Sequence, residues 1–564
     1  MKSFNRILTS AALFCLTIFG QAQTELYLRG NIVPNGKVQL TPSEGQQYQS
    51  EITLDDSHVF LFSDKYVYFE CPSQNYRSDN IRINGGTYTV SFNLDNKSWD
   101  FYAPVDPYRI SAFGSSVCNG QGATGNKGYA WLYGEQLNER YQTGLSLFPF
   151  YVSGISIGGN NTQDLIDRYG DLTRNHSRYV IIGLSMGNEG IHESENKQQT
   201  FNRFSTNMQT IIRKAKADGM IPVVMNNYTR GDFTPDDYYY IKQMNLLIHQ
   251  WDVASVNTLG AIDDGAGHWA SGYMQDNAHP TTNGHKEFFY AMPPSLFDAI
   301  ASGKNQPSRD LSQQITLDHG AQLRFSGEAL VHPFTVSLRF KGNQPGQLFA
   351  YRLRNTSRTA TISVDEGGHV VYTNTTNRSL TTTDSLDNDL WHTVTLTHYY
   401  AQGRTLLYLD SQSPGEVRER VNSLGEVTVG DENSNVSRQL SELFFWRAAL
   451  SPEEVMATVQ GKLLKSSLEL YVPTGSTDQL SNLAMSLNTV QYIAPQTGTT
   501  TGISLNANCN PRLRSLQGIC NPQHPLQPSG RCYDLQGLLV NPVTQRGIYI
   551  HNGRKYVNAQ SFHP

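Results

Sequence analysis

Two residues near position 280 have the types and the spacing of an acid–base pair. Asp276 and His279 are three residues apart in the run Asp276-Asn277-Ala278-His279. At this spacing both side chains fit on one turn of chain, so the carboxylate can hold the imidazole in one tautomer and stabilise its charged form. A histidine held in this way can take a proton from a hydroxyl and return it to a leaving alcohol. The pair therefore predicts the acid and the base of a hydrolytic triad.

Three earlier blocks offer the groups that such a base needs. Gly114-Ser115-Ser116 supplies serine hydroxyls, which are weak nucleophiles until an imidazole accepts their proton. Gly158-Gly159-Asn160-Asn161 and Gly187-Asn188-Glu189 supply backbone and amide donors, which can stabilise the negative oxygen of a tetrahedral intermediate. Taken alone, each block would be an ordinary turn, so the prediction depends on their joint order.

The elements between these blocks alternate between strand and helix patterns. Tyr108–Phe113, Tyr179–Leu184 and Ile221–Met225 are short apolar segments typical of buried strands. Tyr129–Tyr141 and Phe201–Ala217 have the pattern of amphipathic helices. This alternation predicts a mostly parallel sheet over residues 108–302, with helices on both faces. The blocks follow the carboxyl ends of strands, where ligands bind in such folds.

In this order the four blocks resemble those of the SGNH (GDSL-like) hydrolase family. The resemblance implies a flavodoxin-like three-layer α/β sandwich and an ester hydrolase that needs no metal or other cofactor. It implies Ser116 as the nucleophile, His279 as the general base and Asp276 as the residue that orients the histidine. Ser115 replaces the Asp of the family's first block and is the alternative nucleophile.

The same resemblance implies where the oxyanion donors lie. They are the backbone N–H groups of Ser116 and Gly159 and the side chain of Asn188, with Gly158 as the near alternative to Gly159. The third block departs from the family pattern, because Met186 stands where the family has Gly and Glu189 where it has Asp.

The rest of the chain is predicted to be mostly β structure, so the protein is expected to be multidomain. Residues 23–107 alternate between apolar and polar and predict an N-terminal β-sandwich. Residues 311–470 resemble a laminin-G or concanavalin-A-like jelly roll. Residues 476–530 are rich in Thr, Ser, Asn, Gln and Pro and are expected to be a linker. Residues 531–564 are expected to form a C-terminal β tail.

The N-terminus predicts export. Residues 1–22 begin with Lys2 and Arg6, continue with the apolar run Ile7–Phe19 and end in small residues, as a signal peptide does. A lipoprotein signal at Cys15 is the alternative. Removal of the segment changes the net charge from −5 to −7, because it contains no acidic residue. We therefore expect a secreted, periplasmic or cell-surface protein with no transmembrane segment and no affinity for nucleic acid.

We expect an esterase that removes O-acetyl or similar short acyl groups from a polysaccharide or oligosaccharide. Trp269, close to the acid–base pair, is the predicted sugar-stacking residue. A lipid or aryl esterase is the alternative enzyme, and a catalytically inactive glycan-binding protein is the alternative of another class. The sequence carries no signal for an oligomeric state.

Overall fold

The computed structural model describes residues 24–59, 61–311, 314–388, 390–413, 415–474 and 480–495, together with four short strands between residues 532 and 558. The predicted signal peptide lies outside the described residues, as do residues 476–479 and 496–530 of the predicted linker. Residues 480–495 of that linker are described, and they contain a strand that pairs with the C-terminal β region. Within the part of the chain that the structure describes, no helix has both the length and the apolar character needed to cross a membrane. The predicted domain boundaries stay predictions.

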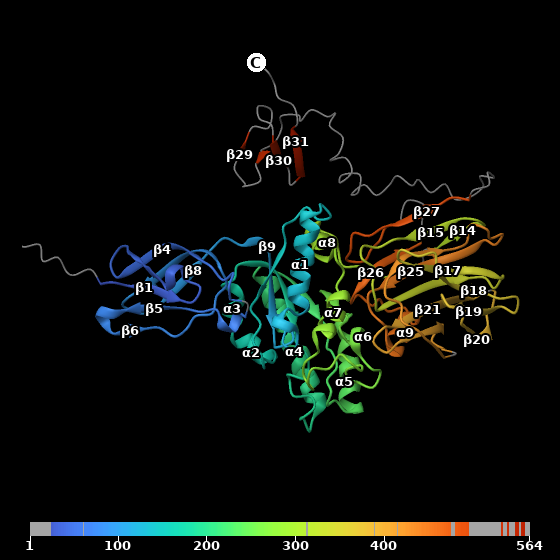
Figure 1. Cartoon of the computed structure of the whole chain (residues 1–564), viewed down its shortest axis with the longest axis horizontal. Helices are drawn as coiled ribbons and strands as arrows, with labels where there is room; N and C mark the ends of the chain where they lie inside the picture. The colour runs from blue at the N-terminus through green and yellow to red at the C-terminus, as the bar shows by residue number, and fades with distance from the viewer. Residues whose placement is uncertain are drawn as a thin grey trace, which may run out of the picture. The chain divides into compact units, whose positions relative to one another are not determined.

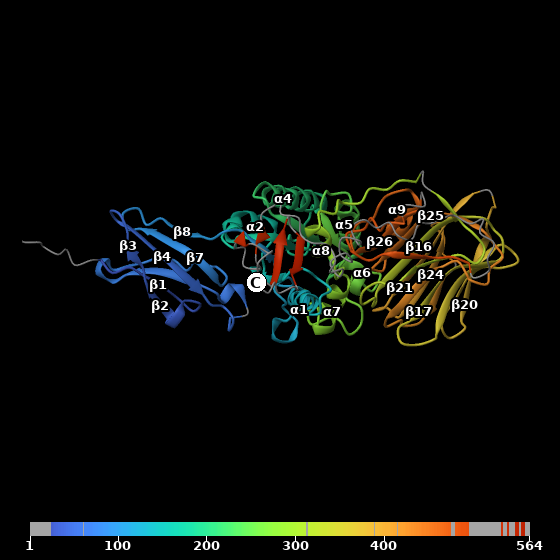
Figure 2. The same cartoon turned by 90° about the horizontal axis from the view of Figure 1, so that it is seen from above.

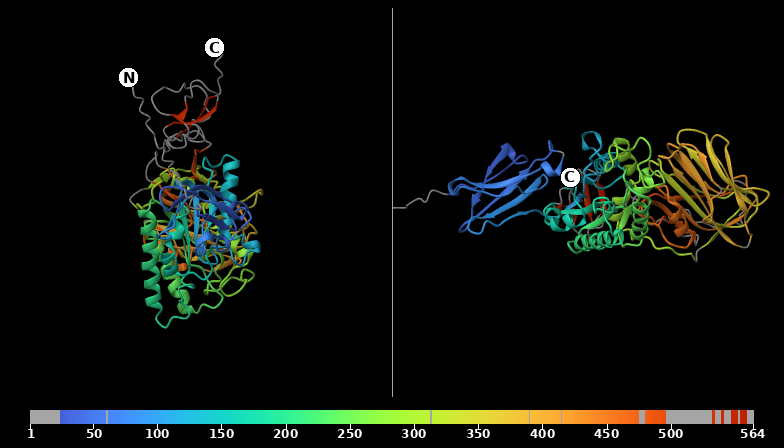
Figure 3. Two further views of the ribbon diagram at one scale, coloured as in Figure 1. Left: turned by 90° about the vertical axis from the view of Figure 1, so that its left-hand side faces the viewer. Right: turned by 90° about the horizontal axis from the view of Figure 1, so that it is seen from below.

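The N-terminal β region comprises strands β1 to β8, drawn in blue in Figure 1 and Figure 3. They form two antiparallel sheets, in the orders β2-β1-β5-β6 and β3-β4-β7-β8. From Tyr88 onward every second residue of β7 is buried, which is the period of a strand with one face on a core. Both sheets contribute to one hydrophobic core, which includes Leu28, Phe69 and Val90. The strands are β1 (Tyr27–Gly30), β2 (Lys37–Gln39), β3 (Thr41–Pro42), β4 (Gln47–Leu54), β5 (Val67–Cys71), β6 (Tyr76–Arg77), β7 (Gly86–Asn93) and β8 (Trp99–Tyr102).

The central α/β region has a parallel sheet in the order β10-β9-β11-β12-β13. Its strands are β9 (Asp106–Gly114), β10 (Tyr151–Gly154), β11 (Ser177–Gly183), β12 (Ile221–Met225) and β13 (Ala254–Val256). The last five residues of β11 are all buried, as expected for a strand covered on both faces. This arrangement confirms the predicted parallel α/β core.

Helices alternate with these strands along the chain. Helices α1 to α8 are labelled in Figure 1. They are α1 (Tyr129–Gln142), α2 (Thr162–Asp167), α3 (Tyr169–Thr173), α4 (Lys197–Ala217), α5 (Pro235–Ile248), α6 (Leu259–Ile262), α7 (Thr282–Tyr290) and α8 (Leu296–Ala301). Helix α5 begins where the sequence dictates, since Thr234 caps its N-terminus, Pro235 occupies the first turn and Asp237 completes a capping box. Helix α4 is longer than the predicted segment by the turn that begins at Lys197.

The C-terminal β region comprises strands β14 to β27 and helix α9, and its labelled strands can be followed in Figure 2. One antiparallel sheet has the order β14-β25-β16-β21-β22-β23, with β26 also paired to β25, and the other has the order β20-β19-β18-β17-β24-β15-β27. Side chains of both sheets meet in one core, which includes Phe334, Tyr351 and Phe445. The antiparallel β architecture is confirmed, and its assignment as a jelly roll stays a prediction.

The elements of this region are β14 (Ile315–Leu317), β15 (Gln322–Phe325), β16 (Phe334–Lys341), β17 (Gly346–Leu353), β18 (Thr359–Val364), β19 (His369–Thr373), β20 (Ser379–Ser385), β21 (Trp391–Tyr399), β22 (Arg404–Leu409), β23 (Glu416–Arg418), β24 (Leu424–Val429), β25 (Arg438–Trp446), α9 (Pro452–Val459), β26 (Leu468–Pro473) and β27 (Val490–Ile493). The tail contains β28 (Cys532–Tyr533), β29 (Leu539–Val540), β30 (Gly547–His551) and β31 (Arg554–Asn558), which pair in antiparallel fashion in the order β29-β28-β30-β31.

Candidate functional site

The first block follows directly from the end of β9. Gly114, the last residue of β9, lies opposite Gly183, the last residue of the parallel strand β11. A Cβ atom on Gly114 would lie 2.1 Å from the carbonyl oxygen of Gly183, so only glycine fits at this position. The backbone N–H of Ser115 donates to the same oxygen over 3.2 Å. The two serines therefore leave the sheet at a tightly packed turn.

The two serines differ in burial. Ser115 is fully buried, and its hydroxyl oxygen has neither solvent contact nor a hydrogen-bond partner. Ser116 keeps 7% of its surface exposed. A nucleophile must reach the substrate, so the geometry favours Ser116 over the alternative Ser115.

The second block lies beside Ser116. A Cβ atom on Gly158 would lie 3.7 Å from the Cβ of Ser116. Gly159 has a φ of +80° and open space around the position of a Cβ, so its backbone adopts the left-handed conformation without any neighbour restricting it. The N–H of Ile157 donates to the carbonyl of Gly114 over 3.1 Å, which ties this block to the end of β9. The structure thus places Gly158 beside Ser116, and the role of Gly159 or Gly158 as an oxyanion donor stays a prediction.

Arg168 holds the first two blocks together, a role that the sequence did not reveal. Its guanidinium donates to the carbonyl oxygens of Gly114 (3.2 Å) and Ile155 (2.9 Å) and to Oδ1 of Asn160 (2.5 Å). Burial lowers the pKa of Arg168 to about 10, although the nearby Asp171 partly offsets this effect. A lone arginine at the end of a short helix has no distinctive spacing, so only the fold could reveal this role.

The third block forms a turn after β11. The N–H of Asn188 donates to the carbonyl of Ser185 over 3.0 Å, and the N–H of Glu189 donates to that of Met186 over 3.1 Å. Met186 is fully buried, so it fills the core where the related family has glycine. Asn188 is partly exposed and Glu189 is buried. Since β11 lies beside β9, this turn begins next to the turn that carries the serines.

The fourth block brings Asp276 and His279 together. Nδ1 of His279 lies 2.8 Å from Oδ1 and 2.9 Å from Oδ2 of Asp276. With Nδ1–H donating to the carboxylate, Nε2 is the ring nitrogen that can accept a proton. Burial tends to raise the pKa of Asp276, but hydrogen bonds from His279 and from the N–H of Ala278 outweigh it and lower that pKa. These hydrogen bonds therefore favour the ionised form of the Asp276 carboxyl.

Trp269 supports the loop that carries this pair. Its Nε1–H donates to the carbonyl of Asn277 over 3.0 Å, and the N–H of Gly231 donates to the same oxygen over 2.8 Å. The indole stacks on Tyr228 with a centroid distance of 5.9 Å and is 6% exposed. These contacts give Trp269 a role in holding the loop, and its binding of a sugar stays a prediction.

Asp276→Asn is expected to lower kcat for ester hydrolysis by about 10³- to 10⁴-fold, because the amide no longer holds the histidine in the productive tautomer. KM should change little, since Asp276 is not expected to touch the substrate. Steady-state kinetics with a chromogenic acetate ester checks this, and circular dichroism verifies folding. A loss of less than tenfold would remove Asp276 from the triad.

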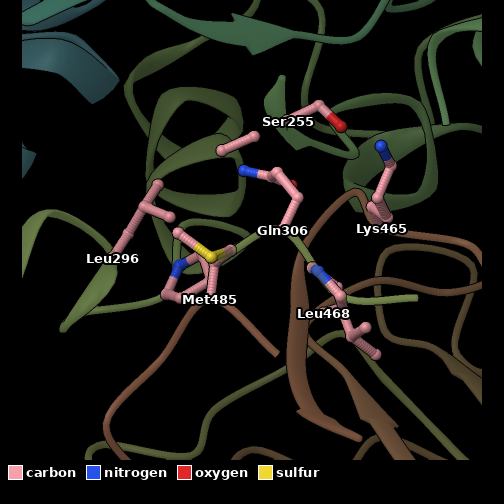
Figure 4. Close-up of a pocket in the computed structure, with 9 residues that line it drawn as sticks. Ser255, Leu296, Gln306, Lys465, Leu468 and Met485 are labelled. Carbon is pink, nitrogen blue, oxygen red and sulfur yellow. The ribbon is translucent and has the colours of Figure 1, made fainter. Parts of the chain in front are cut away.

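A cavity elsewhere in the chain does not suit a substrate. It lies between β13, α8 and β26, and Figure 4 shows Ser255, Gln306 and Lys465 among its lining residues. Its free space holds about one water molecule. Among the residues that the structure describes, no group of three or more His, Cys, Asp or Glu side chains is arranged to hold a metal ion.

The four blocks lie within a segment that matches a protein-family model. A model of the GDSL-like lipase/acylhydrolase family matches residues 112–287. A comparison with curated proteins gave no match.

Solved structures similar to this chain include variants of Axe2 from Geobacillus stearothermophilus. One, described as an acetyl-xylooligosaccharide esterase, has 16% identity, covers 34% of this chain and 94% of its own, and gives a TM-score of 0.28. Another, described as an acetylxylan esterase, has 15% identity, covers 33% of this chain and 91% of its own, and gives a TM-score of 0.28. A SAP-like pentraxin from Limulus polyphemus has 19% identity, covers 27% of this chain and 84% of its own, and gives a TM-score of 0.24. On the family match, residues 112–287, which hold all four blocks, are a domain of the GDSL-like lipase/acylhydrolase family.

Proposed function

We propose that this protein is a serine esterase that removes O-acetyl or similar short acyl groups from a polysaccharide through an acyl-enzyme. The observation that carries the proposal is the pairing of both carboxylate oxygens of Asp276 with Nδ1 of His279, at 2.8 and 2.9 Å, inside a domain that matches the acylhydrolase family. Together with a serine that follows the first strand of the sheet, this pair supports Ser-His-Asp chemistry.

In the proposed reaction Oγ of Ser116 attacks the ester carbonyl carbon while Nε2 of His279 takes the hydroxyl proton. The negative oxygen of the tetrahedral intermediate accepts hydrogen bonds from the N–H groups of Ser116 and Gly159 and from the side chain of Asn188. The intermediate collapses when the imidazolium gives its proton to the leaving sugar oxygen, which leaves Ser116 acylated. Water then attacks the acyl group by the same route, releasing the carboxylic acid and the free serine.

The polysaccharide substrate is the finer part of the proposal. Two antiparallel β regions accompany the hydrolase domain, and the net charge of −7 after removal of residues 1–22 does not favour anionic partners. We also propose that the protein is exported, on the signal-peptide pattern of those residues. The negative net charge and the export signal suit an enzyme that acts on a neutral glycan outside the cytoplasm.

The deciding experiment measures acetate release from acetylated xylan and from 4-nitrophenyl acetate, alongside labelling of the folded protein by a fluorophosphonate. Release from both substrates with one label per chain is the expected result. Release of fatty acid from long-chain lipid esters, with no acetate released from acetylated glycan, would show that the substrate is a lipid ester and not a glycan. A folded protein that neither reacts with the label nor releases acetate would favour the alternative of a catalytically inactive glycan-binding protein.

A further inference from the structure

The side chain of Glu189 links the two segments that are proposed to bind the oxyanion. Glu189 follows Asn188 directly, and its side chain is 2% exposed. Its Oε2 accepts hydrogen bonds from the backbone N–H of Thr162 (3.0 Å) and from the Thr162 hydroxyl (2.8 Å). Thr162 lies three residues after Gly159 and is the first residue of α2. One carboxylate thus joins the second block to the third.

The carboxylate is held in turn from its other side. Nε of Arg203 donates to Oε1 of Glu189 over 2.7 Å, and Nη2 of Arg203 donates to the backbone carbonyl of Glu189 over 2.7 Å. Nδ2 of Asn207 donates to the Thr162 hydroxyl over 2.9 Å. Every oxygen of the Glu189 side chain therefore accepts from a donor whose position is set by α2 or α4. A buried carboxylate with both oxygens satisfied in this way is stiff.

We propose that Glu189 is a positioning residue that sets the distance between the N–H of Gly159 and the side chain of Asn188. The inference rests on the proposed function, in which these two groups bind the oxyanion. Donors of this kind accelerate a reaction only when they are already placed where the negative charge will form. Glu189 does not touch the reacting atoms and acts through Thr162 on one side and through its own backbone on the other.

These contacts also explain why position 189 has a carboxylate and not an amide. In Glu189→Gln one side-chain atom remains an acceptor and the other becomes an NH₂ donor. Whichever way the amide turns, that NH₂ faces either the two donors of Thr162 or the guanidinium of Arg203. One of the two anchors is therefore lost, although the size of the side chain is unchanged.

The test compares Glu189→Gln with wild type in ester hydrolysis and in inactivation by a fluorophosphonate. We expect kcat and the inactivation rate to fall by about 10- to 100-fold together, with KM within about twofold, because the displaced donors serve the transition state. Hydrogen exchange at the amides of residues 158–162 should become faster. Asp167→Asn is the matched control, since Asp167 is an exposed carboxylate on the same helix α2 that does not contact Thr162.

A double variant separates positioning from general damage to the fold. In Glu189→Gln with Arg203→Met, the amide oxygen can face Thr162 while its NH₂ faces the site that the guanidinium left. Recovery of at least fivefold in kcat over Glu189→Gln supports the inference. An unchanged kcat in Glu189→Gln, or a loss confined to KM or thermal stability without recovery in the double variant, overturns it.

The outcome also separates this inference from the proposed function. If wild type neither hydrolyses esters nor reacts with the fluorophosphonate, the proposed function fails, and the catalytic part of the inference fails with it. Unchanged exchange at residues 158–162 in Glu189→Gln overturns the inference even when wild type is active.

Discussion

Replacing Ser116 with alanine is expected to reduce acetate release by about 10⁴-fold or more, whichever ester is used. The hydroxyl is the proposed nucleophile, and no acyl-enzyme can form without it. The residual rate reflects the oxyanion donors and substrate binding, which survive the substitution. The variant should also lose its fluorophosphonate label while it keeps its melting temperature, because the change removes a single oxygen atom from a side chain that is not fully buried.

Ser115→Ala is the matched control for this prediction. The Ser115 hydroxyl is fully buried and unpartnered, so its removal should leave kcat within about threefold. Stability should be unchanged or rise by up to about 1 kcal/mol, because a buried hydroxyl without a partner costs desolvation energy that alanine avoids. A large loss in Ser115→Ala with normal activity in Ser116→Ala would move the nucleophile to Ser115.

Ending the chain after Asn305, which removes the C-terminal β region, is expected to yield no soluble, folded hydrolase. Three buried polar residues of the α/β region depend on that region for hydrogen bonds. Nε2 of His249 and Nδ2 of Asn257 donate to Oε1 of Glu454 over 3.0 and 2.9 Å, and the hydroxyls of Ser255 and Ser466 lie 2.7 Å apart. Each buried polar group that loses its partner costs about 1–3 kcal/mol, a large share of the stability of a typical domain.

The backbones of the α/β region and the C-terminal β region also come into close contact. A Cβ atom on Gly260 would lie 2.3 Å from the carbonyl oxygen of Ala449, so α6 approaches the C-terminal β region at a point where only glycine fits. The truncated chain would expose this surface, so we expect it to aggregate on expression. The amount of soluble protein measures this. A soluble truncated chain with full activity would contradict the prediction.

A point substitution tests the same contact without truncation. Glu454→Ala is expected to destabilise the protein by about 3–5 kcal/mol, because it leaves His249 and Asn257 buried without their acceptor. Glu453→Gln is the control. Its partner is Lys242 at 2.5 Å, and its side chain is 38% exposed, so the loss should stay below about 1 kcal/mol. Urea unfolding of both variants measures the difference. Equal stabilities would show that the contact contributes little.

Much of the fold was predictable because it depends on local patterns. The predicted strand Tyr179–Leu184 is a run of adjacent apolar residues, and β11 (Ser177–Gly183) forms there. The period of two along β7 likewise predicted the N-terminal β structure. The sequence did not reveal that the C-terminal β region is bonded to the α/β region, since Glu454 and His249 are 205 residues apart and no local rule connects them.

The sequence by itself determined the pairing of Asp276 with His279, because three residues of chain on one turn leave their side chains within hydrogen-bond reach. It also determined that serines and glycines follow strands of a parallel sheet. Only the tertiary structure decided that Ser115 is fully buried while Ser116 keeps 7% of its surface exposed, and that Glu189 binds Thr162, 27 residues away. The physical reason is that burial and long-range hydrogen bonds depend on how separate elements pack, whereas a turn depends on neighbouring residues alone.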